Sequence, residues 1–133
     1  MALHLKIIGT ILISLSFIHI IFPRYFNWEN ELKNLSLINK QMMYVHTFFI
    51  AFVVFLMGIF CIYSSADLIN TSLGRQVCLG LSAFWGLRLI FQFTFYSSKL
   101  WKGKLFETIV HIVFSILWTY FTVIFFLIYL SVK

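Results

Sequence analysis

Residues 105–132 read LFETIVHIVFSILWTYFTVIFFLIYLSV, an almost continuous apolar run that carries one glutamate and one histidine. A helix needs about 20 apolar residues to cross the roughly 30 Å hydrocarbon core of a bilayer, so this segment is long enough to span one. Ionisable side chains inside that core cost free energy unless they face protein, water or a ligand. Glu107 and His111 lie four residues apart, on one helical face, which indicates that this face lines an internal site.

The composition is typical of an α-helical membrane protein. Of the 133 residues, 62% are hydrophobic, 20% are aromatic and only 11% are charged. A soluble domain of this size has no means of burying so much apolar surface. The net charge of +6 comes from basic residues scattered at the ends of apolar segments, and this pattern disfavours nucleic-acid binding.

Four apolar runs are long enough to cross a membrane, and they predict spans at residues 3–22, 41–63, 77–96 and 105–132. Pro23 closes the first run because proline cannot continue the helical hydrogen bonds. The later connections are short, so consecutive spans are expected to pack antiparallel. The predicted fold is an all-α integral membrane protein with a single domain over residues 1–133, an antiparallel four-transmembrane-helix bundle.

The polar connection RYFNWENELKNLSLINK, residues 24–40, predicts a short interfacial helix after the first span, at about residues 28–37. Asn27 is a favourable N-cap residue, and acidic residues follow it in the first turn. The amphipathic ring of Trp28 suits the headgroup layer of a membrane.

Basic residues are divided unequally between the two faces of the predicted bundle. The N-terminal face has Lys6, Arg75 and Lys133, and the opposite face has Arg24, Lys33, Lys40, Lys99, Lys102 and Lys104. Lysine and arginine are enriched in cytoplasmic connections, so the face with six basic residues is expected to be cytoplasmic. With an even number of spans, both termini lie on the opposite face, outside the cytoplasm. The expected location is an inner or plasma membrane.

Polar side chains from all four spans are predicted at similar depth below the face opposite the N-terminus: His19, His46, Arg88, Gln92, Glu107 and His111. A rise of 1.5 Å per residue puts them roughly 5–12 Å below that boundary. Helical spacing also gives the last two spans one polar stripe each, listed as Trp85, Arg88, Gln92 and Tyr96, and as Glu107, His111, Ser115, Trp118 and Thr122. These faces are expected to meet inside the bundle, with Arg88 paired to Glu107.

One chemistry that fits this cluster is a haem b centre for electron transfer. His46 and His111 are predicted at equal depth on different helices and suit axial ligation of haem iron. Arg88, or a lysine of the same face, could meet the haem propionates, and Gln92 is a further candidate for binding the cofactor. In fold and histidine placement the chain resembles the small four-helix cytochrome b anchor subunits of quinone-reactive oxidoreductases. The resemblance rests on no shared motif, and what it implies is a redox role beside larger membrane subunits.

A transition metal ion is the second chemistry. His19, His46, His111 and Glu107 form a candidate set of three nitrogen ligands and one oxygen ligand for zinc, iron or copper. The chain contains neither an HExxH motif nor the Glu-x-x-His pairs of di-iron bundles.

Two further interpretations need no metal. The Arg88, Glu107 and His111 side chains could bind an anionic lipid headgroup or a quinone, or the chain could be an accessory subunit that packs against larger membrane partners. No nucleophile elbow or phosphate loop is present, so the sequence names no reaction. Cys61 and Cys78 show no metal-finger spacing and are expected to be buried thiols, although a disulfide between them is geometrically possible.

Overall fold

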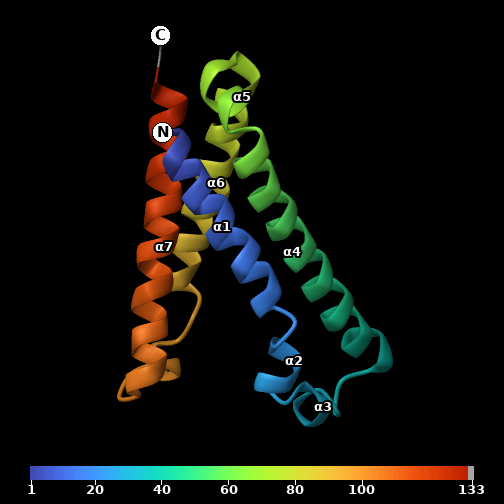
Figure 1. Cartoon of the computed structure of the whole chain (residues 1–133). Coiled ribbons are helices and arrows are strands. Elements are labelled where there is room, and N and C mark those ends of the chain that lie inside the picture. The colour runs from blue at the N-terminus through green and yellow to red at the C-terminus, as the bar shows by residue number, and fades with distance from the viewer. Residues whose placement is uncertain (132–133) are drawn as a thin grey trace. The chain divides into compact units, whose positions relative to one another are not determined.

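The computed structural model describes residues 1–131, and that part of the chain is helical with no strand. The helices are α1 (Ala2–Ile18), α2 (Phe22–Tyr25), α3 (Trp28–Glu31), α4 (Leu37–Tyr63), α5 (Ser65–Asn70), α6 (Ser72–Thr94), the 3-10 turn η1 (Ser98–Leu100) and α7 (Leu105–Leu130) (Figure 1). The chain forms two compact units. The N-terminal unit is Ala2–Ser65, and the C-terminal unit runs from Ala66 onward and includes Met1.

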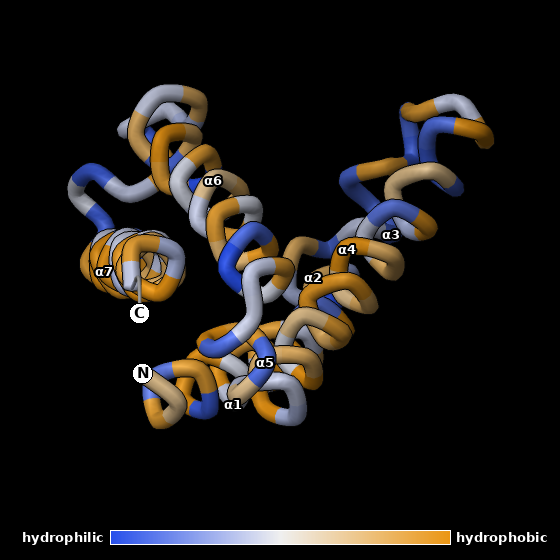
Figure 2. The backbone as a smooth tube through the Cα atoms, turned by 90° about the horizontal axis from the view of Figure 1, so that it is seen from above, coloured by the Kyte–Doolittle hydropathy of each residue, from blue (hydrophilic) through white to orange (hydrophobic). Residues whose placement is uncertain are grey.

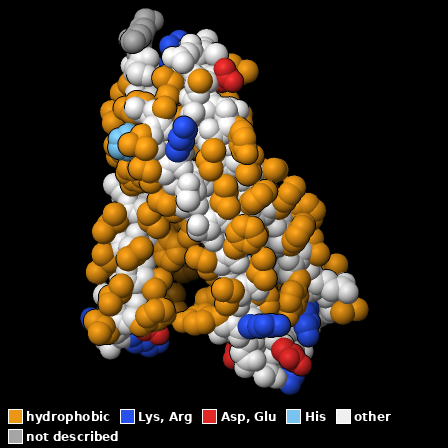
Figure 3. Space-filling model, viewed as in Figure 1, with side chains coloured by type: hydrophobic (Ala, Val, Ile, Leu, Met, Phe, Trp, Pro, Cys, Tyr) orange, Lys and Arg blue, Asp and Glu red, His pale blue; other side chains and the backbone are white. Residues whose placement is uncertain are grey.

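Three of the described helices, α4, α6 and α7, are long and apolar enough to cross a membrane. The prediction of four spans therefore differs in count, because α1 has 17 residues and ends at Ile18, four residues before the predicted end. Its rise of about 25 Å is a little less than the hydrocarbon core. Figure 2 shows hydrophobic colours along α4 and α7, and in Figure 3 hydrophobic side chains cover the visible faces of the long helices.

Hydroxyl caps set the starts of two long helices earlier than the apolar runs indicate. Ser36 accepts a hydrogen bond from the Asn39 backbone N–H, so α4 begins at Leu37 and not near residue 41. Thr71 accepts one from the Gly74 backbone N–H at 2.9 Å, so α6 begins five residues before residue 77. Each cap satisfies one backbone donor that the first helical turn leaves without a partner. The start of α7 at residue 105 is confirmed, and residue 132 of that predicted span lies outside the described residues.

The predicted interfacial helix at residues 28–37 is wrong in length, because α3 has only four residues. Asn27 occupies the predicted N-cap position but has a left-handed backbone, with φ 51°, and makes no side-chain cap bond. Its Oδ1 accepts instead from Asn30 Nδ2 at 3.0 Å, closing a tight local turn. Trp28 is buried and meets Tyr44 edge to face, at 5.3 Å between ring centroids.

The N-terminal unit is an antiparallel hairpin of α1 and α4 that crosses at two glycines. A methyl group added at Gly9 would lie 2.6 Å from the Gly58 carbonyl oxygen, and one added at Gly58 would lie 2.8 Å from the Gly9 carbonyl oxygen. Small residues allow this close backbone approach, which favours helix association in lipid. Phe17 meets Phe55 edge to face further along the same interface.

The C-terminal unit pairs α6 with α7 in antiparallel fashion, and the two polar stripes predicted for these helices meet as expected. Ser82 Oγ donates to the Thr122 carbonyl oxygen at 2.9 Å. The Trp85 and Trp118 rings stack with 4.8 Å between centroids. Cys61 and Cys78, one in each unit, are both buried. The preference for thiols over a disulfide stays a prediction, because a disulfide would join residues of different units.

Candidate functional site

A chain of polar side chains joins the two helices of the C-terminal unit. The Arg88 Nη1 group donates to Gln92 Oε1 at 3.4 Å, one turn further along α6. The Gln92 Nε2 group lies 2.8 Å from His111 Nδ1 on α7. Gln92 is only 8% exposed, so its amide is held between the helices. Three of the residues predicted for the site are therefore joined by two consecutive hydrogen bonds, and we name this group the Arg88–Gln92–His111 chain.

The direction of these hydrogen bonds fixes the protonation of the imidazole. Arginine has no acceptor, so the oxygen of the Gln92 amide must face Arg88 and its NH₂ group must face His111. An amide NH₂ group only donates, so His111 Nδ1 accepts the bond. A neutral His111 ring therefore has its proton on Nε2. The ring presents an N–H donor, not a lone pair, to any group that approaches this nitrogen.

Aromatic rings lie against both end residues of the Arg88–Gln92–His111 chain. The His111 ring stacks on Trp101 at 4.0 Å with an interplanar angle of 7°, and it meets Phe93 edge to face at 5.6 Å. The Arg88 guanidinium lies 5.4 Å from the Trp118 ring centroid and 5.5 Å from that of Tyr96. Cation–π contact of this kind stabilises a charge that is partly removed from water.

The predicted ion pair between Arg88 and Glu107 is wrong for the part of the chain that the structure describes. The Arg88 guanidinium is occupied by Gln92 and by two aromatic rings. Glu107 is exposed in the first turn of α7. A carboxylate is favoured there because the helix N-terminus carries partial positive charge, and this accounts for an acidic residue at the start of an apolar helix.

Sequence reasoning missed Trp101 as a member of the site. This residue lies in the connection between α6 and α7, and its carbonyl oxygen accepts from Thr108 Oγ1 at 2.7 Å. The bond ties the connection back onto α7 and holds the indole over His111. Helical periodicity carries no information about a residue outside the helices, so only the aromatic character of Trp101 offered a signal.

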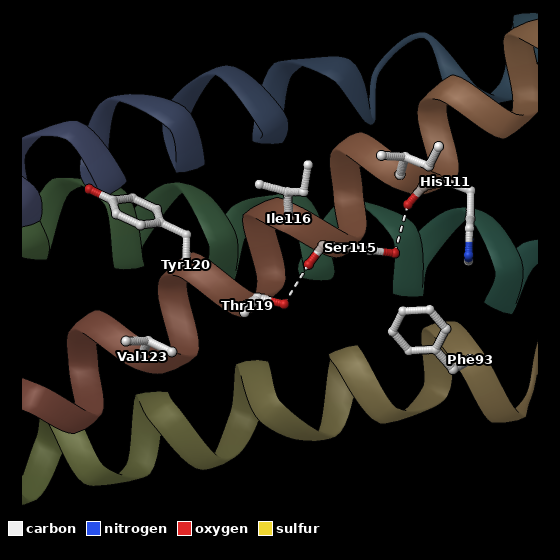
Figure 4. A pocket seen from close by; sticks show the side chains of 8 residues that line it. Phe93, His111, Ser115, Ile116, Thr119, Tyr120 and Val123 are labelled. Atoms are coloured by element: carbon white, nitrogen blue, oxygen red, sulfur yellow. Dashed lines mark hydrogen bonds between the residues drawn. The ribbon is translucent and has the colours of Figure 1, made fainter.

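A pocket of about 670 Å³ begins at His111 and continues along α7 (Figure 4). Its lining alternates polar and apolar side chains: Phe93, His111, Ile112, Ser115, Ile116, Thr119, Tyr120 and Val123. The Ser115 hydroxyl donates to the His111 carbonyl oxygen at 2.7 Å and the Thr119 hydroxyl to the Ser115 carbonyl oxygen at 2.8 Å. Both hydroxyls donate their hydrogen bonds to backbone carbonyl oxygens of α7 itself. The part of the pocket between His111 and Val123 is therefore largely apolar.

The other two predicted histidines belong to the N-terminal unit. His19 is half-buried in the turn after α1, and its Nδ1 lies 2.8 Å from the Leu15 carbonyl oxygen. A carbonyl only accepts, so Nδ1 donates and Nε2 of a neutral ring has a free lone pair. His46 is exposed on α4. The convergence of His19 and His46 with His111 and Glu107 thus stays a prediction, because it joins residues of different units.

Within residues 1–131, no three His, Cys, Asp or Glu side chains form a group able to hold a metal ion. No family model, curated protein or solved structure matches the chain.

Proposed function

We propose that this polypeptide is a small membrane protein that binds an amphiphile, either a lipid or a quinone. The binding site is the Arg88–Gln92–His111 chain of hydrogen-bonded side chains. The observation that carries the proposal is the pair of Gln92 hydrogen bonds, which leaves the proton of a neutral His111 ring on Nε2, where it can donate to an acceptor. Lipid headgroups and quinone carbonyls are acceptors. The pocket that begins at His111 offers apolar surface for the remainder of such a molecule.

The haem and metal alternatives place a different demand on His111. A histidine binds haem iron, zinc or copper through an unprotonated nitrogen. The Gln92 bond occupies Nδ1 and leaves the proton on Nε2, so ligation through His111 requires the amide to turn and its bond to Arg88 to break. This cost favours the amphiphile over a haem between His46 and His111.

One observation at another of the predicted ligands, His19, favours the metal alternative. His19 donates through Nδ1 to the Leu15 carbonyl oxygen, and this is the arrangement in which the other ring nitrogen is ready to bind a metal ion. A redox centre that uses His19, His46, His111 and Glu107 is therefore the second candidate. Purified protein with a Soret absorption band, or with zinc, iron or copper near one ion per chain by elemental analysis, would support it.

The test of the proposed function is the amphiphile content of the purified protein. Solvent extraction and mass spectrometry should find one lipid or quinone species enriched per chain. The His111→Leu variant should retain about tenfold less, because the donor is lost. His111→Gln should retain more than His111→Leu, because its amide still donates.

His46→Leu is the matched control, since it removes an exposed histidine of the other unit. Its amphiphile content should equal that of the unaltered protein. Equal retention by His111→Leu would contradict the proposal. Loss of a Soret band in both the His46 and the His111 variants would establish the haem alternative in its place.

We also propose that α1 acts as a fourth span and that both termini lie outside the cytoplasm. Antiparallel packing of α1 on α4 supports the first point, and the excess of basic residues opposite the N-terminus supports the second. A cysteine introduced at Lys102 should resist a membrane-impermeant thiol reagent in intact cells. The buried Cys61 and Cys78 give a low background for this measurement. Labelling at Lys102 without permeabilisation would reverse the orientation.

A further inference from the structure

The connection between α6 and α7 carries a concentrated positive charge. Lys99, Lys102 and Lys104 are all exposed, and Glu107 is the one acidic residue of the segment 97–107. Three lysines against one carboxylate give this short segment a net charge of +2. A neutral ligand makes no use of such a cluster, whereas an anionic one is attracted to it.

The connection that carries the lysines is held against His111 through Trp101. Trp101, which lies between Lys99 and Lys102 in the sequence, stacks directly on the His111 ring. The bond from Thr108 Oγ1 to the Trp101 carbonyl oxygen fixes the indole in that position. Gly103, with φ 78°, supplies the left-handed turn that brings the chain into α7. The positive charge therefore flanks the residue that covers the imidazole.

The pocket extends away from this charged end. Between His111 and Val123 it follows α7 for twelve residues, which corresponds to about 18 Å of helix. Phe93, Ile112 and Ile116 contribute apolar surface along it. The His111 end of the pocket supplies an N–H donor and adjoins, through Trp101, the connection that carries the lysines, and the other end offers only weakly polar helix surface. This polarity matches an anionic headgroup joined to a hydrocarbon chain.

We infer that the amphiphile is an anionic phospholipid, with its phosphate between the lysines of the α6–α7 connection and His111 Nε2, and an acyl chain along α7. This inference rests on the proposed function and narrows it from amphiphiles in general to one class. Lysine is an effective point-charge partner for phosphate, and His111 adds a directed hydrogen bond. A quinone head has no charge for the lysines to neutralise.

The test compares two lipids that differ in headgroup charge. Native mass spectrometry of the full chain in detergent, titrated with dioleoyl phosphatidylglycerol or dioleoyl phosphatidylcholine, measures each affinity. The protein should prefer phosphatidylglycerol by at least about tenfold, because the contributions of the three lysines multiply and each is about twofold or more. Replacing all three lysines, as Lys99→Gln, Lys102→Gln and Lys104→Gln, should remove that preference.

A matched control carries the same change of charge in the other unit, as Arg24→Gln, Lys33→Gln and Lys40→Gln. This control should keep the tenfold preference. Equal loss in both variants would show a general attraction of basic residues to anionic lipid and would overturn the inference. Displacement of phosphatidylglycerol by equimolar glycerol phosphate would also overturn it, because the phosphate alone would then account for binding.

His111→Leu separates this inference from the proposed function. If that variant loses both lipids while the lysine variant keeps its preference for phosphatidylglycerol, the charge inference fails and the proposed function stands. If His111→Leu binds both lipids as the unaltered protein does, the proposed function fails, and the phospholipid assignment fails with it.

Discussion

The two helical hairpins solve the same packing problem with different residues. In the N-terminal unit, α1 and α4 approach so closely that Gly9 and Gly58 meet through their backbones. In the C-terminal unit, α6 and α7 are separated by stacked tryptophans and by the Arg88–Gln92–His111 chain. Close backbone contact leaves no room between helices, whereas large aromatic side chains hold them apart. The pair held by aromatic side chains is therefore the one that can carry a polar site.

The largest expected effect comes from removing an aromatic spacer. Trp118→Ala should lower the free energy of unfolding by about 3–5 kcal/mol, because it deletes the buried partner of Trp85 and the ring beneath Arg88. Titration with sodium dodecyl sulfate, followed by circular dichroism, measures this loss.

Trp118→Phe is the informative companion variant. The indole N–H groups of Trp85 and Trp118 have no hydrogen-bond partner among the described residues, so the phenyl ring removes a buried donor without breaking a bond. We expect a loss of about 1 kcal/mol or less. A loss as large as that of Trp118→Ala would mean that the indole N–H is essential to the packing.

The next pair of variants adds one methyl group to each hairpin and compares the loss of stability in the two units. Gly58→Ala should destabilise the N-terminal unit by about 1–3 kcal/mol, because the new methyl group meets the Gly9 carbonyl oxygen at 2.8 Å. Gly86→Ala in α6 places its methyl group 3.5 Å from Thr122 Cγ2, an ordinary contact, and should be neutral or slightly stabilising.

Gly80→Ala controls for helix propensity, since nothing lies within 4 Å of its added methyl group. The same detergent titration serves for all three variants. Indistinguishable stabilities for Gly58→Ala and Gly80→Ala would rule out the close crossing of α1 and α4.

A smaller effect is expected from the amide that joins the two helices. Gln92→Leu should cost about 1–2 kcal/mol, because it leaves both Arg88 and His111 Nδ1 without this partner in a partly buried site. Gln92→Glu should restore the bond only if the His111 ring carries its proton on Nδ1, since a carboxylate accepts and cannot donate to Nδ1. Hydrogen exchange of the α6 and α7 backbone amides would report the loosening, and unchanged protection in Gln92→Leu would argue against the bridge.

The smallest effect is expected at Glu107. Glu107→Gln should change stability by less than about 0.5 kcal/mol, because the carboxylate is exposed and Arg88 has Gln92, Tyr96 and Trp118 as its partners. In a double-mutant cycle with Arg88→Gln the two losses should add. A coupling energy above about 1 kcal/mol would restore the ion pair that the sequence predicted.

Helical spacing in the sequence predicted much of the packing in the C-terminal unit. The spacing of Trp85, Arg88 and Gln92 placed them on one face of α6, and the spacing of His111 and Trp118 placed them on the facing stripe of α7. Phase and depth do not determine which side chains bond within such a cluster. Arg88 reaches aromatic rings and an amide within its own unit, and these partners outcompete a carboxylate in the exposed first turn of α7.

The starts of the helices were less predictable because apolar runs do not mark them. Ser36 and Thr71 cap α4 and α6 several residues before hydropathy rises. Ser36, three residues before Asn39 and directly before an apolar residue, was a readable cap signal. The end of α1 at Ile18 had no such signal, since the apolar run resumes after His19 and continues to Pro23.

The protonation of His111 is the central claim, and nitrogen NMR measures it directly. Histidine labelled with ¹⁵N, observed in lipid near neutral pH, gives separate signals for protonated and unprotonated ring nitrogens. The His111→Gln variant assigns the His111 signals by their disappearance. The account predicts a protonated Nε2 and an unprotonated Nδ1 that is hydrogen-bonded to the Gln92 amide. A protonated Nδ1 with an unprotonated or metal-bound Nε2 would contradict it.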